Sequence, residues 1–402
     1  MRRILFLPIF IFLLCVVAPS EACTTFLVSG KYTPDGRPLL YKHRDTGDPN
    51  NALKKFTDGK YLYIGLINAT PNGSNEVWGG YNETGFAIIN SAAYTNNVGD
   101  TTKLMDQEGV LMKKALQCCA TLRDFENLLD TLPKPLGIDA NFGVIDALGG
   151  AAYYEAGNYK YVKADANNPL QAPDGFLVRS NHSFSGKLDK GYGFIRYQTA
   201  YAVLAEAAAA KQFSPEYLLN HISRNLTHAL TGKNMEDHLP ASAENSDYRF
   251  FIDYIPRNSS ASAVLIAGCP RGGSPSQTMM WSLIGFPLTT VAVPVWLDNK
   301  LELPQIVSIG NNGHAWMCDA ALRLKKECFP IERGSGKKYI NFSIVENRQG
   351  TGVLQKIRKV EKLVFQKALP LWKGNKKLNV EAIRAYNEWL EHYIMHFYDD
   401  VK

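Results

Sequence analysis

The residues best placed to do chemistry lie at the end of an apolar N-terminal segment. Residues 4–17 are almost entirely hydrophobic and follow a short basic start, as in a secretory signal. Ser20 and Ala22 then supply the small side chains that signal peptidase requires at positions −3 and −1. We therefore predict that residues 1–22 are a signal peptide and that Cys23 is the first residue of the mature protein.

An N-terminal cysteine carries a nucleophile and a base on one residue. The α-amine titrates at about 7.7–8.0 and the thiol at about 8.5, so the amine can accept the thiol proton near neutral pH. The same principle operates when an N-terminal threonine is activated by its own amine. This chemistry predicts nucleophilic catalysis by Cys23.

Two other interpretations of Cys23 are open at this point. It can be a buried or disulfide-bonded cysteine that happens to follow a signal peptide. It can also be the lipidated cysteine of a lipoprotein, although that signal usually has an aliphatic residue at −3 and a small one at −2, where Ser20 and Glu21 stand. Lipidation blocks both the thiol and the amine, so it is incompatible with catalysis by Cys23.

Composition restricts the class of protein. The chain has 402 residues, 46% of them hydrophobic, and a formal charge of +6 that is dispersed, so it has no nucleic-acid footprint. The longest later apolar run, at 281–297, is broken by glycine and prolines, so we expect no stable membrane insertion. The seven cysteines form neither a disulfide scaffold nor a zinc-ligand spacing, and no metal or organic cofactor is expected. We expect a secreted or periplasmic protein.

The elements that must position Cys23 can be predicted from hydrophobic patterning and turn residues. Strands are predicted at 23–29, 39–45, 61–68, 86–90, 141–146, 151–155, 175–182, 262–267 and 289–296. Helices are predicted at 110–120, 122–132, 196–210, 351–369 and 380–398, with another that starts at Ser214, and 78–85 is predicted to be a turn-rich link. This order favours an α+β fold with helices packed on sheets.

Several short motifs occur in an order that resembles a known family. They are Cys23-Thr24-Thr25, Asp35-Gly36-Arg37-Pro38, Arg44-Asp45, Asn82-Glu83-Thr84-Gly85, Asn141-Phe142-Gly143 and Arg179-Ser180-Asn181-His182. Together with the leader, they resemble N-terminal nucleophile (Ntn) hydrolases of the acyl-CoA:6-aminopenicillanate acyltransferase and choloylglycine hydrolase type. The resemblance covers roughly residues 23–300. It implies a four-layer αββα sandwich within one domain at 23–402, with a C-terminal helical extension at 340–402.

The resemblance also implies roles for individual residues. Cys23 matches the nucleophile, and Asp45 matches the acidic residue that holds its amine and thiol; the alternative for Asp45 is an exposed turn carboxylate. Asn181 matches an asparagine whose side-chain N–H stabilises the oxyanion. Asn90 resembles a second asparagine near the oxyanion, with a strand-end turn residue as the equal alternative.

Three basic residues are candidates for substrate binding. In the bile-salt relatives an arginine precedes the aspartate by three positions, whereas this chain has Lys42 there and Arg44 next to Asp45. Lysine cannot reproduce a forked arginine contact, which argues against a bile-salt-type site. Arg196 matches a family arginine near the site, but we expect it to be a solvated helix charge.

The expected function is that of an exported cysteine amidohydrolase or acyltransferase. It would cleave linear, non-peptide C–N amide bonds of a small-molecule acyl amide through a thioester on Cys23. The alternatives are a related N-terminal-cysteine dipeptidase and an exported binding protein without catalysis. The sequence does not select the substrate or the oligomeric state.

Overall fold

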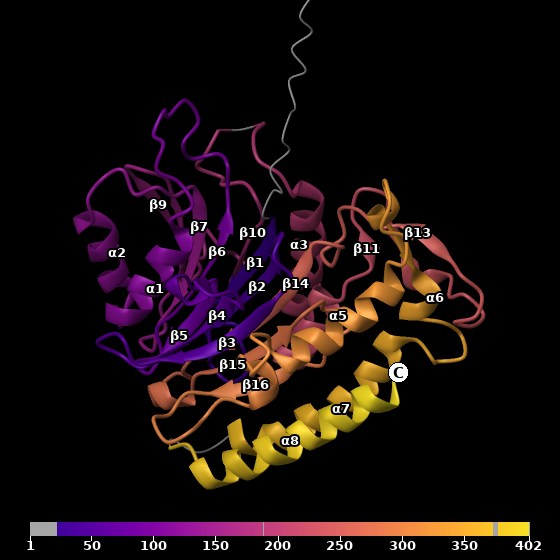
Figure 1. The fold of residues 1–402 in the computed structure, drawn as a ribbon. Helices are drawn as coiled ribbons and strands as arrows, with labels where there is room; N and C mark the ends of the chain where they lie inside the picture. Colours follow the sequence, from indigo (N-terminus) through magenta and orange to yellow (C-terminus); the bar gives the residue numbers. More distant parts are fainter. Residues whose placement is uncertain (1–21, 188, 373–376, 402) are drawn as a thin grey trace, which may run out of the picture.

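Two antiparallel β-sheets pack face to face between outer layers of helices (Figure 1). The computed structural model describes residues 22–187, 189–372 and 377–401, so the predicted signal peptide lies outside the described residues except for Ala22. The helices α1 and α2 cover the seven-stranded sheet, and α3, α5, α7 and α8 cover the six-stranded sheet. The predicted α+β sandwich of four layers is confirmed.

The six-stranded sheet has the order β10-β1-β2-β14-β15-β16. Its strands are β1 (Cys23–Val28), β2 (Leu39–Asp45), β10 (Phe176–Arg179), β14 (Ser260–Ala267), β15 (Met279–Ile284) and β16 (Val293–Trp296). All these strands are buried along their whole length, because one face meets the other sheet and the opposite face meets helices.

The seven-stranded sheet follows the order of the sequence from β3 to β9. Its strands are β3 (Asn51–Phe56), β4 (Tyr63–Asn68), β5 (Gly79–Asn82), β6 (Ala87–Ala92), β7 (Ala140–Ile145), β8 (Ala151–Ala156) and β9 (Tyr161–Asp165). Short two-stranded sheets join β11 (Thr227–His228) to β12 (Lys233–Asn234) and β13 (Tyr248–Phe250) to β17 (Tyr339–Asn341).

The helices are α1 (Glu108–Cys118), α2 (Leu122–Thr131), α3 (Phe194–Ala210), α4 (Pro215–Leu218), α5 (Trp316–Cys328), α6 (Phe342–Val345), α7 (Val353–Trp372) and α8 (Val380–Asp400). Three of them, α2, α4 and α8, begin directly after a residue whose side chain accepts a backbone N–H of the first turn. Thr121 and Asp124 form a reciprocal capping box at the start of α2, which satisfies two backbone N–H groups that the helix itself leaves unpaired. None of the helices among the described residues is long and apolar enough to cross a membrane.

The structure corrects several sequence predictions. The link at 78–85 contains a strand, β5, which pairs with both β4 and β6. Its glycines indicated a turn, but Gly80 is needed for close packing, since a Cβ there would lie 2.1 Å from the Ile64 carbonyl oxygen. The strand predicted at 289–296 begins only at Val293. Strands β3, β9 and β15 and helix α5 were not predicted.

The C-terminal helices α7 and α8 pack directly on the six-stranded sheet. The rings of Trp281 on β15 and Phe365 on α7 lie 4.2 Å apart, and those of Trp296 on β16 and Tyr386 on α8 lie 5.8 Å apart. One apolar cluster therefore runs from the sheets into both helices. This packing makes α7 and α8 part of the layer that supports β15 and β16.

Candidate active site

The hairpin of β1 and β2 brings Cys23 to the polar end of β2. The strands pair so that Cys23 lies opposite Arg44, and the Asp45 N–H donates to the Ala22 carbonyl oxygen at 3.1 Å. Gly36, in the connecting turn, has a φ of 73°, which favours glycine. The peptide group that links Ala22 to Cys23 therefore lies against the end of β2.

The main chain of Cys23 is held by two buried side chains from other elements. Its N–H donates to Asn181 Oδ1 at 3.1 Å. Arg196 Nη1, from the first turn of α3, donates to the Cys23 carbonyl oxygen at 2.7 Å and to Thr24 Oγ1 at 2.8 Å. The backbone of Cys23 is therefore held at two atoms, its nitrogen and its carbonyl oxygen.

Arg196 is therefore not the solvated helix charge that we expected. Arg196 is only 1% exposed, and its Nη2 donates to Asn181 Oδ1 at 2.7 Å. Burial and, after it, the nearby Arg257 guanidinium lower the pKa of Arg196 to about 9. The prediction of a surface charge was wrong because the first turn of α3 packs against β1 and β10 rather than facing water.

The orientation of the Asn181 amide follows from its partners. A guanidinium can only donate, so the Asn181 oxygen must face Arg196, and the same oxygen accepts the Cys23 N–H. The Asn181 nitrogen donates instead to the Ala92 carbonyl oxygen at 2.9 Å. The structure therefore places the Asn181 oxygen against the nitrogen of Cys23, while the Asn181 N–H group that we expected at the oxyanion is bonded to Ala92.

Strand alternation divides the polar residues of β2 between two faces. Lys42 lies opposite Thr25 in the sheet, and Thr25 accepts a hydrogen bond at 2.8 Å from Tyr153 of the other sheet. Since paired residues share a face, Cys23, Lys42 and Arg44 face the space between the sheets. Asp45 lies on the opposite face of the six-stranded sheet, which is covered by helices. The carboxylate expected to hold the Cys23 thiol therefore lies on the opposite face from the Cys23 side chain.

The face shared with Cys23 is cationic. Lys42 and Arg44 are each 1% exposed, and their charged groups lie 5.6 Å and 4.7 Å from the centre of the Trp78 ring. Lys42 Nζ donates to Asn90 Oδ1 at 2.5 Å, and Asn90 lies within β6 rather than at a strand-end turn. Because its oxygen faces Lys42, the Asn90 NH₂ group points away from that lysine and can donate elsewhere.

The face shared with Asp45 carries a hydrogen-bonded chain. Ser260 Oγ donates to Asp45 Oδ1 at 2.5 Å, so His43 Nε2, at 2.8 Å from Ser260 Oγ, must be the donor in their contact. His43 Nδ1 is then an acceptor for the Tyr41 hydroxyl at 3.3 Å. Burial lowers the pKa of His43 to about 4, which keeps the ring neutral at ordinary pH.

Two residues of this cluster were missed by the sequence analysis. Arg257 Nη2 donates to Asp45 Oδ2 at 2.6 Å, and Ser260, at the start of β14, pairs with Asp45 across the sheet. A signal was present in the sequence, because a polar stretch at 257–259 precedes the apolar strand β14, just as Arg44 and Asp45 end the apolar strand β2. Only the pairing of β14 with β2 brings these polar ends together.

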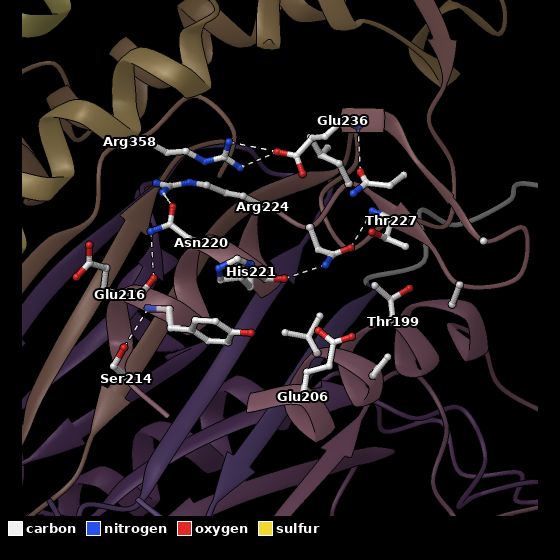
Figure 2. Close-up of a pocket in the computed structure, with 18 of the residues that line it drawn as sticks. Thr199, Glu206, Ser214, Glu216, Asn220, His221, Arg224, Thr227, Glu236 and Arg358 are labelled. Atoms are coloured by element: carbon white, nitrogen blue, oxygen red, sulfur yellow. Dashed lines mark hydrogen bonds and ion pairs between the residues drawn. The ribbon is translucent and has the colours of Figure 1, made fainter. Parts of the chain in front are cut away.

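A cavity of about 920 Å³ lies apart from Cys23. It lies between α3, α4 and α7, with Arg224, Glu236 and Arg358 among its walls (Figure 2). Thr199 of α3 lines this cavity one helical turn beyond Arg196, whereas Cys23 is not part of its lining. Within residues 22–187, 189–372 and 377–401, no group of three or more ligating side chains could hold a metal ion.

No protein-family model matches the chain, and no curated protein matches its sequence. Solved structures do match. An N-acylethanolamine-hydrolyzing acid amidase ortholog from Caenorhabditis elegans has a TM-score of 0.40 at 13% identity, over 61% of this chain and 92% of that chain. Penicillin V acylase from Agrobacterium tumefaciens has a TM-score of 0.39 at 14% identity, over 68% and 86%.

A mutant of the conjugated bile acid hydrolase from Clostridium perfringens has a TM-score of 0.42 at 12% identity, over 70% of this chain and 93% of that chain. These values describe a likeness in general architecture at low sequence identity.

Proposed function

We propose that the chain, after removal of residues 1–22, is an exported cysteine amidohydrolase that cleaves linear, non-peptide C–N amide bonds. The observation that carries this proposal is the double anchoring of Cys23 at the start of a buried strand. Asn181 Oδ1 receives the N–H of Cys23, and Arg196 binds its carbonyl oxygen. An amine freed at this nitrogen would stay next to its own thiol.

In the proposed reaction the free amine of Cys23 takes the thiol proton, and the thiolate attacks the amide carbon. The carbonyl π-electrons move to oxygen, and their return expels the leaving amine, which receives the proton from the α-ammonium group. Water, deprotonated by the same amine, then cleaves the thioester and releases the carboxylic acid. An acceptor amine in place of water would give acyl transfer.

The surrounding charges support these steps. The Arg196 guanidinium lies against the Cys23 carbonyl oxygen, and a neighbouring cation favours the neutral form of an amine, which can act as a base. The NH₂ group of Asn90 lies on the face of the Cys23 side chain, and we assign it the role of an oxyanion donor. Loss of one such donor typically costs about 10²–10³-fold in turnover.

The proposal also addresses the substrate. Lys42 and Arg44 place two positive charges on the face of the thiol, so we expect an acyl amide with an anionic group near the scissile bond to be preferred over a neutral one. N-acyl amino acids have this chemistry. The names of the similar solved structures supply further probes for comparison, namely an N-acylethanolamine, penicillin V and a conjugated bile acid.

The test begins with exported protein whose N-terminus is established by intact mass. Protein that starts at Cys23 should hydrolyse at least one member of the panel and should show an acyl adduct on Cys23 after acid quenching. A Cys23→Ala variant is the matched control and should show neither. A mature N-terminus at another residue, or a diacylglycerol on Cys23, contradicts the mechanism. A free N-terminal Cys23 that binds acyl amides without forming the adduct indicates a binding protein instead.

A further inference from the structure

Two adjacent cysteines far from Cys23 in the sequence form a pair of thiols in contact. Cys118 is the last residue of α1 and Cys119 follows it, and their sulfur atoms lie 3.9 Å apart. Cys118 is partly exposed, whereas Cys119 is 1% exposed. One thiol can therefore meet a reagent in solution, and the other lies directly behind it.

We propose that Cys118 and Cys119 are a thiol–disulfide exchange site, at which a low-molecular-weight disulfide such as glutathione disulfide is reduced and a reversible Cys118–Cys119 disulfide is formed. The Cys118 thiolate attacks one sulfur of the small disulfide, forms a mixed disulfide and releases one glutathione thiolate, which takes up the Cys119 proton. The Cys119 thiolate then attacks the Cys118 sulfur and expels the second glutathione thiolate. Two protein thiols are oxidised and one glutathione disulfide becomes two glutathione molecules.

The electrostatics assign the attacking role to Cys118. Contact with the Cys119 thiol lowers the pKa of Cys118 to about 7, and the ammonium groups of Lys114 and Lys60 act in the same direction. The pKa of Cys119 is raised, first by Cys118 and then by burial. Because the thiolate is the nucleophile in exchange, Cys118 attacks first and Cys119 resolves the mixed disulfide.

The other described cysteines outside the candidate active site lack these properties. Burial raises the pKa values of Cys269, Cys318 and Cys328, with Cys318 at about 11 and Cys328 at about 12. All three are buried. Exchange should therefore occur selectively at the end of α1.

Ring closure at this position must be strained and hence easily reversed. Neighbouring Cα atoms are about 3.8 Å apart across a trans peptide, whereas disulfides usually span about 4.4–6.8 Å between Cα atoms. The sulfurs must also approach to about 2.05 Å. Closing the ring distorts the end of α1, where the Asn82 side chain donates to the carbonyl oxygens of Leu116 and Cys119 at 2.9 Å and 2.8 Å. Strained disulfides are the readily reduced ones.

The test is peptide mapping of the folded full chain after incubation with glutathione disulfide. Trypsin releases residues 115–123, which contain only these two cysteines, so the readout is independent of Cys23. We expect this peptide to lose two hydrogen atoms without a bound glutathione, and dithiothreitol to restore it. A peptide with two glutathione adducts, or one left unmodified while Cys23 reacts, overturns the proposal.

Single variants separate the two roles. Cys119→Ser should stop at the mixed disulfide and retain one glutathione on Cys118. Cys118→Ser leaves only the buried thiol and should stay unmodified over the same time. Thermal melting of both variants verifies folding. Equal glutathione adducts on both variants would mean that the thiols react independently and that the exchange site does not exist.

Discussion

Two buried arginine–carboxylate pairs in this chain differ in how completely their hydrogen bonds are used. The pair between Arg224 and Glu361 is forked, with both oxygens of Glu361 at 2.5 Å from guanidinium nitrogens. The remaining Arg224 donors bind the carbonyl oxygens of Pro287 and Thr290 and the side chain of Asn220. This pair holds α7 against Arg224, which follows α4, and against the link between β15 and β16.

The pair between Arg257 and Asp45 is open by comparison. A single contact of 2.6 Å joins the two side chains, and the other Asp45 oxygen accepts from Ser260. Arg257 Nε has no hydrogen-bond partner in the part of the chain that the structure describes, and the side chain is 15% exposed. A pair whose hydrogen-bond donors are all used, here called saturated, stabilises the fold and has no donor left for a new partner. An open pair such as Arg257 and Asp45 keeps a free donor and can change partners during a reaction. Activity and stability should therefore be separable by mutation.

The largest expected effect is on activity alone. Cys23→Ala should abolish amide hydrolysis, because it removes the only proposed nucleophile, while its unfolding curve in urea should match that of the wild type. Near wild-type turnover by this variant would eliminate Cys23 as the nucleophile.

The next test moves the base without removing the thiol. An additional alanine before Cys23 converts the α-amine into an amide, which is not basic at neutral pH. Turnover should fall by about 10²–10⁴-fold, the usual contribution of general-base catalysis. The control is the same protein trimmed to start at Cys23, with both N-termini verified by mass. Equal rates would show that a conventional base elsewhere serves Cys23.

Breaking the saturated pair should affect stability. Glu361→Ala leaves a buried arginine unpaired, so the free energy of unfolding should fall by about 3–5 kcal/mol. Turnover per folded molecule should stay within about twofold at a temperature where the variant remains folded. Denaturant titration measures the stability, and the mass of the acyl adduct counts the active sites. A large loss of kcat with unchanged stability would mean that this pair serves the reaction rather than the fold.

Breaking the open pair should have the opposite profile. Asp45→Asn leaves the Arg257 guanidinium without its carboxylate. The charge of Arg257 acts on Arg196, which binds the Cys23 carbonyl oxygen. Loosening this anchor should lower kcat by about 10²-fold, which corresponds to about 2.7 kcal/mol in the barrier. Its loss of unfolding free energy should be smaller than that of Glu361→Ala, since Arg257 can reach solvent. Unchanged kinetics would remove Asp45 from the site.

The most gradual effect concerns the pH dependence of stability. His43 has a folded pKa of about 4, below its unfolded value of about 6.5, so the unfolded chain binds more protons between these values. Stability from His43 is therefore complete above pH ~6.5 and is lost as the pH falls towards ~4, by at most about 3 kcal/mol. His43→Gln, which keeps a donor for Ser260, should flatten this acid-side loss. Identical slopes for the two proteins would contradict the assigned burial.

Much of the frame could be predicted from local sequence. The strands at Cys23 and Leu39, the capped helix α2 and the long C-terminal helices follow from β-branched runs, capping residues and apolar periodicity. Strand β15 could not be recognised, because its short apolar run contains a single β-branched residue and so does not distinguish a strand from a helix. The sequence of β5 suggested a turn because it is rich in glycine, and glycine is favoured both in turns and where two backbones pack closely.

The sequence by itself determined the identity of the nucleophile candidate. The leader pattern ends at Cys23, and the chemistry of an N-terminal cysteine does not depend on the fold. The sequence also determined that Asp45 ends a strand that pairs with the strand starting at Cys23, because two strands joined by a short turn form a hairpin.

Only the tertiary structure decided how these residues are used. Arg196 and Asn181 come to the main chain of Cys23 from elements more than 150 positions away, and Arg257 reaches Asp45 across 212 positions. Strand alternation and sheet pairing then placed the thiol and the Asp45 carboxylate on opposite faces. Such contacts are fixed by which strands and helices become neighbours, and that depends on burial summed over the whole chain rather than on any local pattern.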